Sequence, residues 1–197
     1  AGHNLKEVRS LKGKSNYNKL FDLCSELMMV ITKTNKPVIA KVHGAAFAAG
    51  CQLVATCDLA IASNDSYFST PGIKIGLFCS TPMVALTRSI NPKKSLEMLL
   101  TGESIQSEEA LEIGLINKVV EKENLRDSVI DLAKKITNLP RGVLELGKKT
   151  FYSQYNLELN DAYKLTSKVM VENLSKKDSK EGINAFIEKR KANWNND

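Results

Sequence analysis

Residues 43–58, HGAAFAAGCQLVATCD, combine a run of glycine and alanine with one amide side chain, Gln52. A small-residue turn that runs into a helix leaves the first N–H groups of that helix unpaired and partly positive. Because little Cβ bulk surrounds these donors, a ligand oxygen can approach them, and donors aimed at a developing enolate form an oxyanion hole. Close packing of a helix on a strand selects the same small residues, so the spacing leaves both interpretations open.

The elements around this stretch predict an α/β fold. Short β-branched or apolar runs predict strands at 37–44, 58–63 and 67–70, with a helix at about 48–56 between the first two. The segment 15–34 predicts an amphipathic helix that faces a core through Tyr17, Leu20, Phe21, Cys24, Leu27, Met28 and Ile31.

Helices dominate the remainder of the chain. We expect them at 81–90, 92–100, 107–114, 124–139, 142–155, 157–174 and 179–191, with a short strand at 115–120. Asn91, Ser107 and Asp178 are candidate N-caps, and Gly114 is a candidate helix stop. The layout predicts one domain, with a core over residues 1–139 and a helical part over residues 140–197.

Composition excludes several classes of function. The net charge is +6, but the lysines are scattered and no reader motif for nucleic acid is present. The four cysteines form no C-x-x-C pair, which favours packed, reduced thiols, and two histidines argue against a transition-metal site. No apolar run approaches membrane-spanning length.

Several motifs in order carry a family resemblance. AGHNLKEV, PVIAKVHGAAFAAGCQLVATCDLAIAS, FSTPGIKIGLF, LTGESIQSEEALEIGLINKVV and EGINAFIEKRKANW resemble the crotonase (enoyl-CoA hydratase/isomerase) superfamily over nearly the whole chain. The resemblance implies a spiral of β-β-α units whose first strands lie before Ala1, with a C-terminal helical part that assembles a homotrimer or homohexamer. It further implies an acyl-CoA thioester as the substrate, with coenzyme A as part of that substrate and no separate cofactor. The location implied is mitochondrial, with the cytoplasm as the alternative, and the metabolic role is in fatty acid metabolism.

The family's oxyanion-hole amides match the backbone N–H groups of His3 and Ala49. The family's segment beside the acyl-CoA matches Asn4, Leu5 and Lys6, and a basic position that can reach CoA phosphate matches Lys189. The full set of substrate-binding candidates is Ala1, Asn4, Leu5, Lys6, Ala45, Cys79, Phe186 and Lys189.

The two catalytic glutamates of family hydratases match Gln52 and Gly72 here. Glutamine does not titrate near neutrality and glycine has no side chain, so the resemblance makes ordinary hydration doubtful. Asp58 and Asp65 occupy strand and turn positions that favour structural roles. The imidazole of His3 and the thiol of Cys79 are weaker substitutes, since no activating partner is evident in the sequence.

Three functions therefore remain open. The first is an acyl-CoA-binding hydratase or isomerase of lyase-like chemistry with non-standard groups. The second is a decarboxylase of malonyl- or methylmalonyl-type thioesters, or a thioesterase-type reaction, which rests on the oxyanion hole alone. The third is a non-catalytic acyl-CoA-binding protein.

Overall fold

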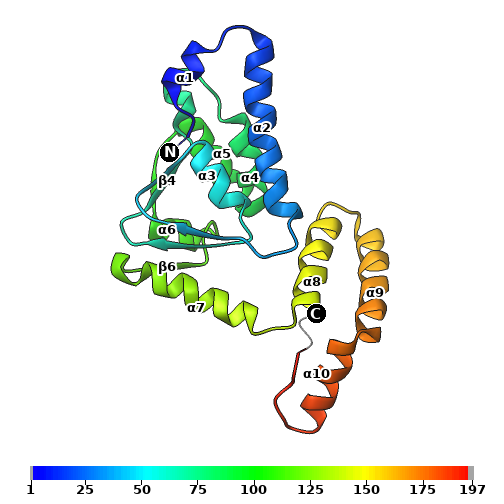
Figure 1. Ribbon diagram of the computed structural model, residues 1–197. Coiled ribbons are helices and arrows are strands. Elements are labelled where there is room, and N and C mark those ends of the chain that lie inside the picture. The colour runs from blue at the N-terminus through cyan, green and yellow to red at the C-terminus, as the bar shows by residue number, and fades with distance from the viewer. Residues whose placement is uncertain (1, 195–197) are drawn as a thin grey trace. The chain divides into compact units, whose positions relative to one another are not determined.

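The computed structural model describes residues 2–194, which are mostly helical with two small sheets. Residues 2–32 and 38–131 form one compact unit, and residues 33–37 and 132–194 form a second. The two units are treated separately below (Figure 1).

Both sheets belong to the first unit. One contains β1 (Ile39–Val42), β3 (Leu59–Ser63) and β6 (Lys118–Val120), all parallel. The other contains β2 (Ala45–Phe47), which is parallel to β4 (Tyr67–Ser69), and β5 (Ile105–Gln106), which is antiparallel to β4. The chain therefore changes sheet between β1 and β2 and again between β3 and β4.

The predicted turn after residue 44 is not wholly a turn, because β2 lies inside it. Gly44 ends the first strand with a φ of 63°, in the left-handed region that glycine adopts without steric cost. Ala45 then pairs with Tyr67, so three small or apolar residues join the second sheet before α3 begins. β2 is too short to produce a visible period-two pattern.

The helices of the first unit pack around these sheets. They are α1 (Leu5–Ser10), α2 (Lys14–Lys33), α3 (Ala49–Thr56), α4 (Ser80–Ser89), α5 (Pro92–Thr101), α6 (Ser107–Glu112) and the start of α7 (Leu125–Thr137), with 3-10 turns η1 (Pro71–Ile75) and η2 (Lys122–Asn124). Cys51, Phe68, Leu86, Met98 and Leu99 are almost fully buried at the centre of this core.

The prediction that the whole apolar face of α2 is buried was wrong. Met28 and Ile31 are buried, whereas Tyr17, Phe21 and Leu27 stay 40–51% exposed. Only the C-terminal half of α2 therefore contributes a buried face, and its N-terminal half is available to border a site.

Two predicted caps were wrong and one was confirmed. Asn91 caps α5 by accepting a hydrogen bond from the Lys93 N–H at 2.9 Å. Ser107 is instead the first residue of α6, and its hydroxyl donates to the Asn64 carbonyl at 3.1 Å. Asp178 lies within α10 (Lys177–Ile187), whose N-cap is Lys176.

The second unit contains α8 (Arg141–Gln154) packed on α9 (Leu159–Ser175), followed by α10. No residue of α8 or α9 is buried, and an apolar groove between them is lined by Leu146, Phe151, Val169 and Met170 among others. Large apolar side chains therefore stand exposed along these helices.

Candidate functional site

The N-terminus of α3 is the structural centre of the candidate site. Its N-cap, Ala48, has φ 48° and ψ −114°, a backbone conformation that costs an L-residue on the order of 1–3 kcal/mol. The Ala48 N–H donates to the Ser69 carbonyl at 2.9 Å, which anchors this turn to β4. Ala48 supplies no capping side chain, so the N–H groups of the first turn of α3, beginning at Ala49, face outward without an intrahelical acceptor.

The segment that contains Gly2 lies directly against this helix start. A Cβ at Gly2 would lie 3.0 Å from the Cβ of Ala48 and 3.4 Å from the backbone nitrogen of Ala49. A side chain at position 2 would push the two segments apart by a few tenths of an ångström, so glycine favours this close approach. The structure therefore brings the backbone of Gly2, and of His3 next to it, beside the open amide of Ala49.

The side chain of His3 turns toward α2. Its ring meets the ring of Phe21 edge-on, with centroids 5.6 Å apart and an interplanar angle of 68°. The imidazole therefore packs against α2, and the backbone N–H of His3 stays the group that the family resemblance assigns to the oxyanion hole.

Gln52 lies one turn into α3 and is 4% exposed. Its Oε1 accepts a long hydrogen bond from the Cys24 Sγ of α2, at 3.9 Å. Phe21 and Cys24 are three residues apart on α2 and therefore share a face. That face contacts both His3 and Gln52, so the two sequence-predicted positions border one region.

Gly72 is enclosed by its own loop. The Leu77 N–H donates to the Gly72 carbonyl at 2.9 Å, which folds the loop back on η1. A Cβ at Gly72 would lie 2.8 Å from the Cys79 Sγ, 3.3 Å from the Leu77 carbonyl carbon and closer still to the Leu77 carbonyl oxygen. The space that a side chain at position 72 would enter is therefore filled.

Cys79 is a packing residue in this geometry. It is 8% exposed at the N-cap of α4. Burial raises the pKa of its thiol, and the neighbouring Gly72 N–H offsets only part of that rise. A thiol with a raised pKa is a poor nucleophile at neutral pH because the reactive form is the thiolate.

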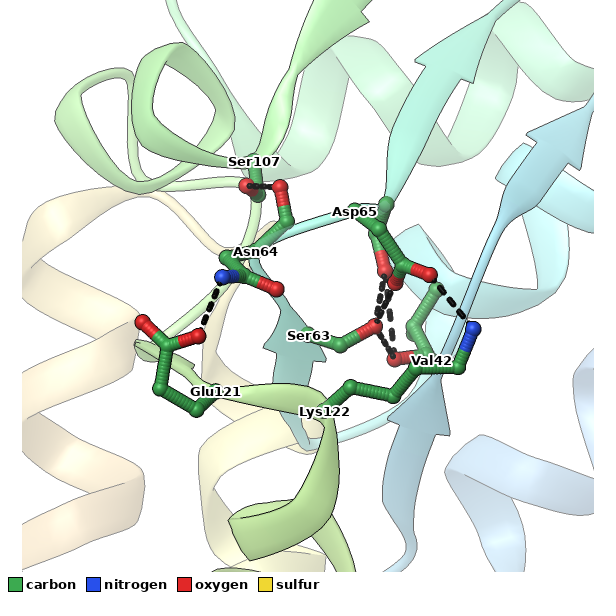
Figure 2. Close-up of polar contacts among 8 residues, drawn as sticks. Val42, Ser63, Asn64, Asp65, Ser107, Glu121 and Lys122 are labelled. Carbon is green, nitrogen blue, oxygen red and sulfur yellow. Dashed lines mark hydrogen bonds and ion pairs between the residues drawn. The ribbon is translucent and has the colours of Figure 1, made fainter.

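The two aspartates near the sheet make structural hydrogen bonds. The Asp58 carboxylate accepts from the Val38 N–H at 2.6 Å. Asp65 accepts from the Lys122 ammonium at 2.7 Å and from the Ser63 hydroxyl, and these hydrogen bonds, that of Lys122 first, lower the pKa of its carboxyl group. Figure 2 shows the contacts of Asp65 joining the β3–β4 turn to η2.

The remaining candidates are dispersed. Asn4 caps α1, because its side chain accepts from the Lys6 N–H at 3.1 Å and donates to Glu7 at 2.9 Å, while Leu5 and Lys6 are exposed. Ala45 begins β2. Ala1 lies outside the described residues.

Two further candidates belong to the second unit. Phe186 is 85% exposed on α10, and Lys189 follows that helix with φ 53°. The Arg190 guanidinium forms a two-pronged ion pair with Glu181 at 2.7 and 2.9 Å, which fixes the chain just after Lys189.

Sequence reasoning missed the part that α2 takes in the site. Cys24 and Phe21 were assigned to a core-facing stripe, and no motif marks them as neighbours of Gln52 and His3. Between residues 2 and 194, no three histidine, cysteine, aspartate or glutamate side chains gather as metal ligands. None of the helices described is both long and apolar enough to cross a membrane.

Comparisons with known proteins agree with the fold. The sequence profile of the family "Enoyl-CoA hydratase/isomerase" matches residues 1–197. The chain is 52% identical over 194 residues to the rat "Enoyl-CoA hydratase domain-containing protein 3, mitochondrial" and 50% identical over 197 residues to the human protein of that name. These matches cover 98% and 100% of the chain and 65% of each relative, so the chain spans about 65% of the length of these relatives.

Solved structures give the same result. A crystal structure of the human domain-containing protein 3 superposes with a TM-score of 0.95 at 51% identity, covering 98% of this chain and 77% of that one. A Mycobacterium smegmatis enoyl-CoA hydratase superposes with a TM-score of 0.97 at 44% identity, covering 98% and 76%. The α/β fold of this chain is therefore crotonase-like, and the resemblance found in the sequence is confirmed.

Proposed function

The chain belongs to the enoyl-CoA hydratase/isomerase family, and we propose that it binds an acyl-CoA thioester whose carbonyl oxygen accepts hydrogen bonds from the backbone N–H groups of His3 and Ala49. The observation that carries this proposal is the approach of Gly2 to the uncapped start of α3. Two backbone N–H donors, one of them at a helix start, stabilise an oxyanion without moving a proton. Coenzyme A enters as part of the substrate, and the proposal includes no separate cofactor.

Ordinary hydration does not fit the side chains around these amides. A positioned general acid or base contributes about 10²–10⁴-fold to the rate, but Gln52 cannot exchange a proton near neutrality. Gly72 has no side chain, and the carbonyl of Leu77 fills the space beside it. The activity that we propose is therefore one that uses the oxyanion hole without a pair of glutamates.

Decarboxylation of a malonyl- or methylmalonyl-type thioester is the alternative that fits this description. The bond between the α-carbon and the carboxylate breaks, CO₂ leaves, and the electron pair becomes an enolate held by the two amides; water then supplies the proton. Non-catalytic acyl-CoA binding, which requires neither bond breaking nor protonation, is the remaining alternative.

A panel of acyl-CoA thioesters tests the proposal on the full-length protein. Acetyl-, butyryl-, crotonyl-, malonyl- and methylmalonyl-CoA would each be added at about 100 times an expected Kd, where a ligand that binds only the folded state stabilises it by about 2.7 kcal/mol. A thermal shift with at least one thioester that exceeds the shift with free CoA at equal concentration supports acyl-CoA binding. No shift with any thioester refutes it.

Product analysis on the same panel separates the alternatives. CO₂ release from malonyl- or methylmalonyl-CoA supports the decarboxylase, and formation of 3-hydroxybutyryl-CoA from crotonyl-CoA supports a hydratase with non-standard groups. Binding without turnover of any thioester supports the non-catalytic alternative.

We further propose that Lys6 and Lys189 contact the phosphates of CoA, and that Ala1, Asn4, Leu5, Ala45, Cys79 and Phe186 line the path of the acyl-CoA. The exposure of Leu5, Lys6 and Phe186 supports these assignments. Lys189→Ala is expected to weaken binding of butyryl-CoA but not of butyryl-pantetheine, which lacks the nucleotide phosphates. Equal weakening of both would contradict a phosphate contact.

The sheet changes at β1–β2 and β3–β4 support a spiral of β-β-α units over residues 1–139, and the helices after residue 140 support an assembly role. Leu159, Tyr163, Val171, Phe186 and Ile187 are 67–85% exposed. We propose that these helices form contacts in a homotrimer or homohexamer of the full-length protein. Light scattering that gives a monomer mass would contradict this.

The names of the curated relatives also support a mitochondrial location, which fractionation of the source cells would test.

A further inference from the structure

Gln52 is nearly buried, yet only the oxygen of its side-chain amide has a hydrogen-bond partner. Oε1 accepts from Cys24, and within residues 2–194 the amide nitrogen Nε2 has no hydrogen-bond acceptor. In the same part of the chain, every fully buried side-chain nitrogen or oxygen has a partner. Nε2 therefore keeps contact with accessible space although the side chain as a whole is 96% buried.

Helix geometry shows where that space lies. Ala49 and Gln52 are three residues apart on α3, so they share a face, and long helical side chains project toward the helix N-terminus. The amide of Gln52 therefore projects over the turn that carries the open N–H of Ala49. One helical turn rises about 5 Å, and the projection of the Gln52 side chain toward the helix N-terminus covers part of that rise, which brings its amide toward the Ala49 N–H.

The contact with Cys24 selects which end of the amide faces this space. A thiol is a weak S–H donor and a weak acceptor, and a carbonyl oxygen is its better partner. Burial raises the pKa of Cys24, so the thiol remains protonated at neutral pH and continues to donate. With Oε1 held by the thiol, Nε2 is the group presented beside the oxyanion-hole amides.

We propose that Cys24 positions Gln52 so that its Nε2 donates to a ligand, and that the acyl group bound here carries an oxygen on C3, as a ketone, hydroxyl or carboxylate. This inference rests on the proposed acyl-CoA binding and specifies its substrate class. A ligand that covers Nε2 must offer it an acceptor in place of water, because a donor left buried and unpaired weakens binding. A ligand without an oxygen at C3 leaves Nε2 unpaired and binds more weakly.

The test compares ligands matched in length. Isothermal titration of the full-length protein would use acetoacetyl-CoA and butyryl-CoA, which differ only in the C3 oxygen. A net hydrogen bond of about 0.5–1.5 kcal/mol corresponds to about two- to twelvefold tighter binding of acetoacetyl-CoA. Malonyl-CoA and 3-hydroxybutyryl-CoA would then identify whether a carboxylate, ketone or hydroxyl is preferred.

Variants separate positioning from packing. Gln52→Leu should abolish the preference while butyryl-CoA still binds, and Cys24→Ala should reduce it because Oε1 loses its donor. Cys24→Ser keeps a donor but on a shorter bond, so its preference should lie between those of the wild type and Cys24→Ala. Ser25→Ala is the matched control on α2, since the Ser25 hydroxyl donates only to the Phe21 carbonyl at 2.8 Å, and it should leave the affinity ratio unchanged.

The outcomes distinguish the two proposals. Equal affinity of the wild type for acetoacetyl-CoA and butyryl-CoA overturns the inference and leaves acyl-CoA binding standing. No binding of any thioester overturns acyl-CoA binding itself. A preference that Gln52→Leu abolishes but Cys24→Ala leaves intact overturns the positioning role of Cys24.

Discussion

Gly72→Ala adds a single methyl group where the loop between η1 and α4 is tightest. The added Cβ would lie 2.8 Å from the Cys79 Sγ, and ordinary contacts begin near 3.4 Å, so this sulfur would have to move by about 0.6 Å. The carbonyl of Leu77 is still closer and is held by the hydrogen bond from the Leu77 N–H to the Gly72 carbonyl. The obstruction is therefore mainly backbone, which cannot rotate away as a flexible side chain does.

Two contributions to the free energy of unfolding oppose each other at position 72. Forcing extra volume into a packed site costs about 1–3 kcal/mol. Gly72 lies outside the left-handed region, so alanine also lowers the entropy of the unfolded chain, which stabilises by about 0.4–1 kcal/mol. The net expectation is a destabilisation of about 1–2 kcal/mol.

Urea unfolding of the wild type and Gly72→Ala measures this difference, provided that the slope of the transition is unchanged. Gly147→Ala is the matched control, because its added Cβ has no atom within 4 Å and lies within α8, where alanine is favoured by about 0.5–1 kcal/mol. Cys79→Ala removes the sulfur, so Gly72→Ala should cost less in that background than in the wild type. A Gly72→Ala protein as stable as the wild type would refute the steric argument.

The same geometry limits attempts to build a hydratase into this site. Gln52→Glu replaces an amide with a carboxylate of nearly equal size. Gly72→Glu must first displace the Leu77 carbonyl and the Cys79 thiol. We expect the double variant to be destabilised and to gain no crotonyl-CoA hydration, which a coupled assay for 3-hydroxybutyryl-CoA would measure.

Three further outcomes follow from strain, burial and charge. Ala48→Gly should stabilise by about 1 kcal/mol in urea unfolding, because it relieves the positive φ of Ala48, whereas Ala55→Gly inside α3 should destabilise by a similar amount. Burial, together with a smaller contribution from the nearby Cys79, raises the pKa of Cys51 to about 12, so mass spectrometry should find Cys51 unmodified by N-ethylmaleimide at pH 8 until the protein unfolds; labelling in the native state would contradict this. Hydrogen bonds from Arg190 and from the Asn193 N–H lower the pKa of Glu181 from 4.5 to about 2, so its contribution to stability is present above pH 4.5 and is lost as the pH falls toward 2. Glu181→Gln should therefore lower the Tm at pH 6 and converge with the wild type near pH 2; a constant difference between these pH values would contradict the linkage.

Hydrophobic periodicity was sufficient for the longer elements because it reflects burial directly. The helix predicted at 15–34 is α2 (Lys14–Lys33), and the strand predicted at 58–63 is β3 (Leu59–Ser63), whose residues are mostly buried. Elements set by long-range pairing gave no such signal. β2 exists because Ala45–Phe47 pairs with a strand more than twenty residues later, and nothing within three residues encodes that partner.

The candidate site shows the same contrast between features that local sequence predicts and features that depend on long-range contacts. Small residues before a helix predicted an open helix start, and α3 begins there without a capping side chain. The contact between Cys24 and Gln52 joins residues 28 positions apart, and the obstruction at Gly72 depends on how residues 71–79 fold back. Residue type alone shows that a carboxylate is absent at position 72, but only the fold shows that its space is occupied.

The Leu77 carbonyl and the Cys79 thiol fill the space beside Gly72, and this limits the chemistry that the site can perform. If the space beside Gly72 were open, water could enter it and serve as the proton donor or acceptor that a side chain would otherwise provide. With the Leu77 carbonyl and the Cys79 thiol in that space, the nearest groups are an acceptor engaged in the loop and a thiol whose pKa burial raises. Neither group delivers a proton at neutral pH, whereas the open amide of Ala49 and the Nε2 of Gln52 are both able to donate a hydrogen bond to a ligand without losing a proton. A site of this kind stabilises oxygen-centred negative charge better than it transfers protons, and this is why reactions that generate an enolate by losing CO₂, or binding without reaction, fit it better than hydration.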